Sequence, residues 1–169
     1  SQLKCHIKLA ENLDSLDEKY EHLKSAKKLS NKRDKTNNKK IHSLAFSLAT
    51  ALYVSGAAEK AYSVYEEFNI LETTLTELAS VSDISTIREQ HLGLVGLAST
   101  IFLKGKAEEA YEISRRIYNI SKEASRIFLD SALELARKGK LTDSFGLSEA
   151  ITLQDDILVE TLNFIPYFA

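Results

Sequence analysis

The chain has 169 residues, 44% of them hydrophobic and 27% charged, which fits one soluble domain with a buried core. Six Gly, one Pro and no Trp favour long helices over a turn-rich β fold, and the single cysteine, Cys5, excludes an intramolecular disulfide. The formal net charge is −2, divided into +5 over residues 1–42 and −7 over residues 43–169, an asymmetry that indicates electrostatic contacts.

Periodic apolar residues predict a series of helices along the chain. A helical region over 2–30 comes first and a polar break over 31–40 follows it. Three helical pairs come next: 41–55 with 57–80, 86–104 with 106–120, and 122–138 with 140–163. A break at Val81–Ser85, "VSDIS", separates the first two pairs, and Asp83 or Ser85 is expected to cap the helix after it.

The most apolar run extends from Leu92 to Leu103 and is twelve residues long. A membrane-spanning helix needs about 20 apolar residues. We therefore expect this run to form a buried helix of a soluble core.

One phrase occurs three times, as "SGAAEKAYSVYEEF", "KGKAEEAYEISRRI" and "KGKLTDSFGLSEAI", and the copies align on Gly56, Gly105 and Gly139. Each glycine is expected to end a helix in the left-handed conformation. Acidic residues follow each glycine and suit the positive end of the next helix dipole. Shared positions before and after the glycines are the small residues Ala49, Ala98, Ala132, Ala61, Ala110 and Ser144, and the larger residues Leu52, Ile101, Leu135, Val64, Ile113 and Leu147. The pattern predicts an antiparallel helical hairpin, repeated three times.

An earlier, degenerate copy is a further candidate. In "DSLDEKYEHLKSA", Asp14 takes the glycine position and Tyr20 the tyrosine position. The sequence leaves open whether this segment is a fourth hairpin.

The segment "LVGLASTIFLKGKAEEAYEISRRI" resembles a tetratricopeptide-type repeat, and the 34-residue step from Gly105 to Gly139 equals the period of that family. The usual proline at the end of the second helix is missing, since Thr73, Lys122 and Asp156 occupy its positions. A related class, such as the pentatricopeptide repeats, stays open. The resemblance implies an all-α fold of antiparallel helical hairpins, stacked as a short right-handed α-solenoid of about three to four hairpins.

The expected organisation is a single helical-repeat domain over 1–169, with an N-terminal helix and basic loop over 1–40 and three hairpins over 41–169. Because the chain has no Met and starts at Ser1, we expect it to be a piece of a longer protein. The end, "NFIPYFA", is apolar, whereas a terminal solenoid unit needs a polar outer face. We expect this tail to fold back as a cap, or the chain to continue into another unit.

Residues that would carry catalysis do not form a recognisable pattern. None of the four histidines, His6, His22, His42 and His91, has metal-ligand spacing to another His or to Cys5. Adjacent acidic pairs such as Glu108 and Glu109 diverge on a helix, which favours a solvated face over acid–base chemistry. We therefore expect no catalytic residue, no metal site and no cofactor.

The resemblance implies that a partner lies against the first helix of each pair. The matching positions are Phe46, Thr50 and Tyr53, then Val95, Ser99 and Phe102, and in the third pair Leu129, Leu133 and Ala136. Since these residues are mostly apolar, we expect them to bind an apolar protein or peptide segment. The alternative is that helices of the chain itself, for example residues 2–30, cover them.

A second candidate surface is the basic segment Lys24–Lys40, which carries eight Lys/Arg and one acid, Asp34. Its patch residues are Lys27, Lys28, Lys32, Arg33, Lys35, Lys39 and Lys40. Lys32–Lys40 is expected to be a solvated, mobile loop, and a site for nucleic acid or an anionic membrane is the alternative. The acidic balance of 43–169 argues against a nucleic-acid groove.

These features favour a non-enzymatic protein-interaction module, an adaptor or a chaperone-like protein, in the cytoplasm. A nucleic-acid-associated helical-repeat module is the alternative. The sequence does not specify an oligomeric state.

Overall fold

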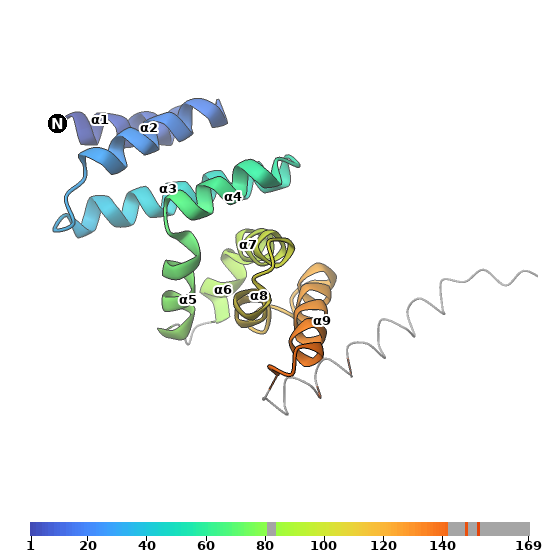
Figure 1. Cartoon of the computed structure of the whole chain (residues 1–169). Helices are drawn as coiled ribbons and strands as arrows, with labels where there is room; N and C mark the ends of the chain where they lie inside the picture. Colours follow the sequence, from blue (N-terminus) through green and yellow to red (C-terminus); the bar gives the residue numbers. More distant parts are fainter. Residues whose placement is uncertain (81–83, 142–147, 149–151, 153–169) are drawn as a thin grey trace, which may run out of the picture. The chain divides into compact units, whose positions relative to one another are not determined.

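The computed structural model describes residues 1–80, 84–141, 148 and 152 (Figure 1). All regular secondary structure in these residues is α-helical, which confirms the all-α prediction. The chain divides into two compact units, Ser1–Ser82 and Asp83–Ala169, and we describe each unit by itself.

The first unit contains five described helices: α1 (Gln2–Asn12), α2 (Leu16–Leu29), α3 (Lys35–Val54), α4 (Ala58–Glu67) and α5 (Ile70–Ser80). They pack in sequential pairs, α1 with α2 and α3 with α4, which lie side by side in Figure 1. Helix α3 also packs against α1 and α2, and α5 packs against α4 and α3. The core of the unit includes Ile7, Ala10, Leu23, Ala26, Ile41, Ala45, Leu48, Ala49, Leu52, Ala61 and Val64.

The predicted helical region 2–30 is two helices rather than one. The chain leaves α1 at Leu13, and Ser15 begins α2 by accepting a 3.3 Å hydrogen bond from the backbone N–H of Glu18 on its hydroxyl oxygen. Asp14 lies in the connection, so the segment that the sequence left open is part of a helical pair. Its backbone does not take the left-handed conformation of the three glycines.

The predicted polar break 31–40 is wrong over its second half, because α3 begins at Lys35. Asp34 causes this early start. Its Oδ1 accepts a 3.1 Å hydrogen bond from the backbone N–H of Asn37 and thereby satisfies a donor that the first helical turn leaves unpaired. Lys35, Lys39 and Lys40 are consequently helical residues and not part of a mobile loop.

The three repeated glycines end their helices as predicted. Gly56, Gly105 and Gly139 have φ angles of 86°, 82° and 67°. At each one, two backbone hydrogen bonds of 2.8–3.0 Å close the helix, which is the Schellman arrangement. The glycine N–H donates to the carbonyl three residues earlier, which belongs to Tyr53, Phe102 and Ala136 in the three turns. The N–H of the residue after the glycine, which is Ala57, Lys106 or Lys140, donates to the carbonyl of Leu52, Ile101 or Leu135, respectively.

The small residues of the repeat lie where two helices approach closely. Ala49, Ala98, Ala132, Ala61 and Ala110 are all 0% exposed, which confirms the prediction that they pack inside the fold. A larger side chain at these positions would push the paired helices apart.

The predicted helix 57–80 is interrupted at Asn69, which divides it into α4 and α5. Asn69 has a φ of 49°. The backbone N–H of Asn69 donates a 3.2 Å hydrogen bond to the carbonyl of Glu66, which closes the end of α4. Asparagine tolerates this left-handed conformation better than most residues do. The apolar period continues across Asn69, with Phe68 and Ile70 both buried, so the pattern alone does not reveal the break.

The second unit contains four described helices: α6 (Ile84–Glu89), α7 (His91–Leu103), α8 (Ala107–Ser114) and α9 (Lys122–Arg137). Helix α8 packs against both α7 and α9. One core cluster consists of Ala107, Tyr111, Phe128, Leu129, Ala132 and Leu135. Tyr111 and Tyr118 both stack on Phe128, with ring centroids 5.4 and 4.9 Å away.

Two predicted boundaries in this unit need correction. The helix expected over 86–104 is divided at Gln90, and the helix expected over 106–120 ends at Ser114. After Ser114 the backbone hydrogen bonds join residues that are three apart. For example, the Ile117 N–H donates to the Ser114 carbonyl at 3.0 Å. Ile117 nevertheless stays fully buried, which is why its spacing fitted a helix.

The apolar run Leu92–Leu103 belongs to α7, where Leu94, Val95, Leu97 and Ala98 are completely buried. None of the helices in the described part of the chain is long and apolar enough to cross a membrane. Several predictions lie outside the described residues: the cap at Asp83, the helix 140–163 beyond Leu141, the last half of the third repeat copy, and the tail 163–169.

Candidate functional site

The first predicted contact surface is a stripe on α3 formed by Phe46, Thr50 and Tyr53. Intervals of four and three residues place these side chains on one helical face, and all three are half-buried. Residues such as Ala45 and Leu52, on another side of α3, are buried. The Thr50 hydroxyl donates a 2.9 Å hydrogen bond to the Phe46 carbonyl, so the exposed part of the stripe is mainly aromatic.

A buried tyrosine, Tyr65 of α4, lies near Tyr53. Burial, with a smaller electrostatic effect of Tyr53, raises the pKa of Tyr65. Its hydroxyl is buried and makes no hydrogen bond to the described residues. Tyr53 is therefore the partly exposed member of this tyrosine pair, and Tyr65 is the buried one.

The second predicted contact surface, on α7, is less accessible. Val95 is completely buried, whereas Ser99 and Phe102 are half-buried. Phe102 packs against the α8–α9 core cluster, so much of its surface is already used within the unit. Because α3 and α7 belong to different units, the two stripes are separate candidate surfaces.

The third set of predicted positions lies on α9. Leu129 is buried in the core cluster, Leu133 is 43% exposed, and Ala136 is exposed near the helix end. Only Leu133 offers a large apolar side chain to solvent here.

Two members of the basic patch have structural roles. The Nζ of Lys27 donates a hydrogen bond to the Glu67 carbonyl and lies 5.3 Å from the centroid of the Phe68 ring, which connects α2 with the end of α4. Lys40 forms a 2.6 Å ion pair with Glu11, which connects α3 with α1.

The other patch residues are exposed and form no ion pair with any residue that the structure describes: Lys28, Lys32, Arg33, Lys35 and Lys39. Asp34, the one acid among them, is committed to the helix cap. Hydrogen bonds, first from the Asn37 backbone and then from its side chain, lower the pKa of this carboxyl. Of its eight cations, the segment therefore presents these five without an ion pair to a described residue, together with one locally bonded carboxylate.

A histidine pair was not predicted from the sequence. His6 of α1 and His22 of α2 are brought together with their Nδ1 atoms 2.9 Å apart. Their separation of sixteen residues gives no metal-ligand or catalytic spacing. Only the pairing of α1 with α2 places them face to face, so the sequence carries no local signal for the pair.

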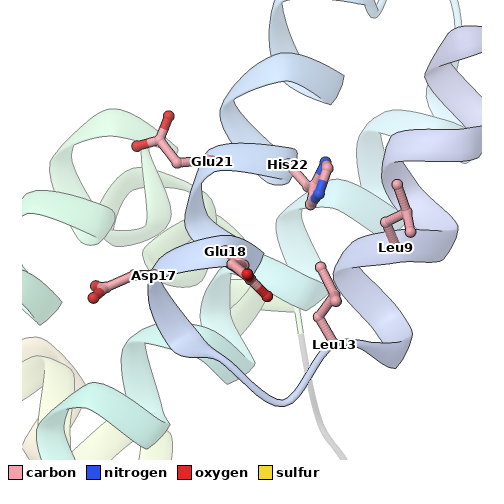
Figure 2. Close-up of a pocket in the computed structure, with 6 residues that line it drawn as sticks. All are labelled: Leu9, Leu13, Asp17, Glu18, Glu21 and His22. Carbon is pink, nitrogen blue, oxygen red and sulfur yellow. The ribbon is translucent and has the colours of Figure 1, made fainter.

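A shallow pocket of about 360 Å³ lies beside this pair, between α1 and α2. Figure 2 shows its lining residues, which are Leu9, Leu13, Asp17, Glu18, Glu21 and His22. Its acidic residues lie on one helix, and its leucines lie on the other helix and at the end of it. In the described ranges 1–80 and 84–141, no three His, Cys, Asp or Glu side chains are grouped so that they could hold a metal ion.

Comparisons with protein-family models, with curated proteins and with solved structures find no significant match to this chain. The likeness to the tetratricopeptide repeats therefore remains a prediction from the sequence.

Proposed function

We propose that this chain is a non-enzymatic protein-interaction module of the tetratricopeptide-like kind, and that it binds a partner segment along the Phe46–Thr50–Tyr53 stripe of α3. One observation carries the proposal. Two aromatic side chains on one face of a long helix stay partly exposed, although other faces of that helix are packed against four helices of the same unit. Partly exposed aromatic residues are typical anchors of protein interfaces.

The proposed architecture is a short right-handed α-solenoid. Its support is the sequential pairing of helices together with three glycine-terminated turns that share one hydrogen-bond pattern. Stacked hairpins of this kind leave one helix of each pair available to a partner.

Charge on α3 indicates the chemistry of the partner. Lys35 and Lys39 precede Phe46 by eleven and seven residues, intervals that place them on the same face of the helix as the stripe. Both are exposed. The partner segment that fits this face has apolar side chains opposite Phe46 and Tyr53 and acidic side chains opposite the two lysines.

Selection from a displayed library of random peptides tests the proposal, because it requires no candidate partner. We expect selection on the full chain to enrich peptides that combine apolar and acidic residues. Affinity should fall at least about tenfold in a Phe46→Ser, Tyr53→Ser variant, since buried aromatic anchors contribute about 2 kcal/mol or more to binding.

Ser47→Ala is the matched control, because Ser47 is exposed on α3 but points to a different side of the helix. It should leave the affinity unchanged. Circular dichroism and denaturation confirm that each variant is folded. Equal binding by the wild-type chain and the double variant, or no enrichment at all, would refute the proposal.

A second candidate function, association with nucleic acid, is favoured by the exposed cations Lys28, Lys32, Arg33, Lys35 and Lys39. Phosphate binding by several cations depends steeply on salt. A titration with a single-stranded oligonucleotide at low and at physiological salt should show binding only at low salt if these cations carry it. Absence of binding at low salt removes this candidate.

A further inference from the structure

The His6–His22 contact has the geometry of a hydrogen bond between two imidazole rings. The Nδ1 atoms are 2.9 Å apart, and the ring centroids are 5.2 Å apart. The difference between the centroid distance and the nitrogen distance is about twice the distance from the centre of an imidazole ring to one of its ring atoms. The two nitrogen atoms therefore lie between the ring centres and point toward each other.

Such a contact needs one proton between the two nitrogen atoms. If both rings are neutral, one Nδ1–H donates and the other Nδ1 accepts. If one ring is charged, the same bond persists and is charge-assisted. If both rings are charged, two N–H donors face each other and two positive charges repel. We propose that His6 and His22 form a proton-operated latch that holds α1 against α2 until both rings are protonated.

Several charged groups near the pair are engaged by other residues. On α2, Asp17 is paired with Lys60 of α4 at 3.2 Å, and Glu21 with Lys24 at 3.6 Å. Figure 2 shows Asp17 and Glu21 pointing away from Leu9 of α1, whereas His22 projects toward the space between the two helices.

Other charges lie on Glu18 of α2 and in contacts of α1 with α3 and the residue before it. Glu18 lines the pocket beside His22. Glu11 of α1 is paired with Lys40 of α3, and Lys4 of α1 acts on Asp34, which precedes α3. These carboxylates weaken the repulsion between two charged rings. None of them is hydrogen-bonded to either ring in the described residues, where the two nitrogen atoms bond to each other at 2.9 Å.

Helix α1 can respond to the loss of the His6–His22 hydrogen bond. Helix α1 has eleven residues, a length at which an isolated helix is marginal in water, so its stability depends on packing. Its buried residues are Ile7 and Ala10, a small apolar contribution. Loss of one interhelical hydrogen bond and gain of a repulsion therefore shift the local opening of α1 measurably.

A double-mutant cycle with His6→Gln and His22→Gln in the full chain tests the latch at about pH 7.5 and at about pH 4, because a hydrogen-bonded pair takes up its second proton at a lower pH than its first. The coupling between the two residues should be stabilising at the higher pH and destabilising at the lower one. The protection factors of the α1 amides, which correct hydrogen exchange for its intrinsic pH dependence, should fall about tenfold on acidification of the wild-type chain, and much less in the double variant.

His91→Gln is the control, because His91 bonds to Ser121 in the other unit at 3.0 Å. It should keep the fall of the α1 protection factors. Nitrogen NMR of the wild-type imidazoles at neutral pH gives a test that needs no variant: one of the two rings should carry its proton on Nδ1. A coupling of equal sign and size at both pH values, or two rings that both carry the proton on Nε2 alone, would overturn the proposal.

Discussion

Substitution of the repeat glycines by alanine measures how much unfolding free energy the chain loses when a residue other than glycine occupies the left-handed turn. At Gly56, Gly105 and Gly139, an added Cβ would meet no atom within 4 Å, so alanine causes no clash. The φ angles of 67–86° impose the whole cost, about 1–2 kcal/mol for an L-residue. Alanine also lowers the entropy of the unfolded chain, which offsets about 0.4–1 kcal/mol. We expect each variant to lose about 1 kcal/mol of unfolding free energy.

Chemical denaturation followed by circular dichroism measures these losses. Because the three turns share one hydrogen-bond pattern, Gly56→Ala and Gly105→Ala should differ by no more than about 0.5 kcal/mol. Gly105→Asn should lose less, since asparagine visits the left-handed region more easily. Ser47→Ala, at an exposed position inside α3, should be neutral or stabilising. If Gly105→Ala were as stable as the wild-type chain, the left-handed turn would not exist.

Two further predictions concern pH. Tyr20→Phe removes a 2.6 Å hydrogen bond to Glu67 and should cost about 0.5–1 kcal/mol at neutral pH. That bond is the main reason that the pKa of Tyr20 rises from 10.0 to about 12, so its contribution to stability should be lost as the pH rises between these values. A spectrophotometric tyrosine titration checks this. Ionisation of every tyrosine near pH 10 would refute it. For His42, burial lowers the pKa below its ordinary 6.5, more than Glu77 raises it. The unfolded chain then binds the proton more readily, so stability should fall as the pH drops below about 6.5, and denaturation series should show a smaller fall for His42→Leu. An unchanged pH profile in that variant would contradict the burial of His42.

The helical pairs are predictable from sequence because the signals are local. Glycine at a helix end, alanine at a close approach and periodic apolar residues each specify their own neighbourhood. Two of the errors arise at polar residues where the backbone changes course. Asp34 starts α3 early, and Asn69 divides a helix whose apolar period continues without interruption. Hydrophobic periodicity reports which residues are buried and not whether the backbone between them is continuous.

The candidate sites are predictable only in part, because surfaces depend on packing between helices. The spacing of Phe46 and Tyr53 was sufficient to place them on one face of α3. It could not show that Val95, at the matching position of the next repeat, is completely buried. It also could not show that His6 meets His22, because their contact depends on how α1 and α2 are rotated against each other.

Accessibility of the α3 stripe tests the central claim most directly. In a Cys5→Ser background, which removes the one exposed native thiol, single cysteines replace Phe46, Tyr53, the exposed Ser47 and the buried Ala49. The rate of reaction with a maleimide reports how open each position is. The Phe46→Cys and Tyr53→Cys variants should react within about tenfold of the Ser47→Cys variant, and far faster than the Ala49→Cys variant. Protection of both stripe positions as strong as that of Ala49→Cys would show that the chain covers this face itself, and would contradict the proposed interaction surface.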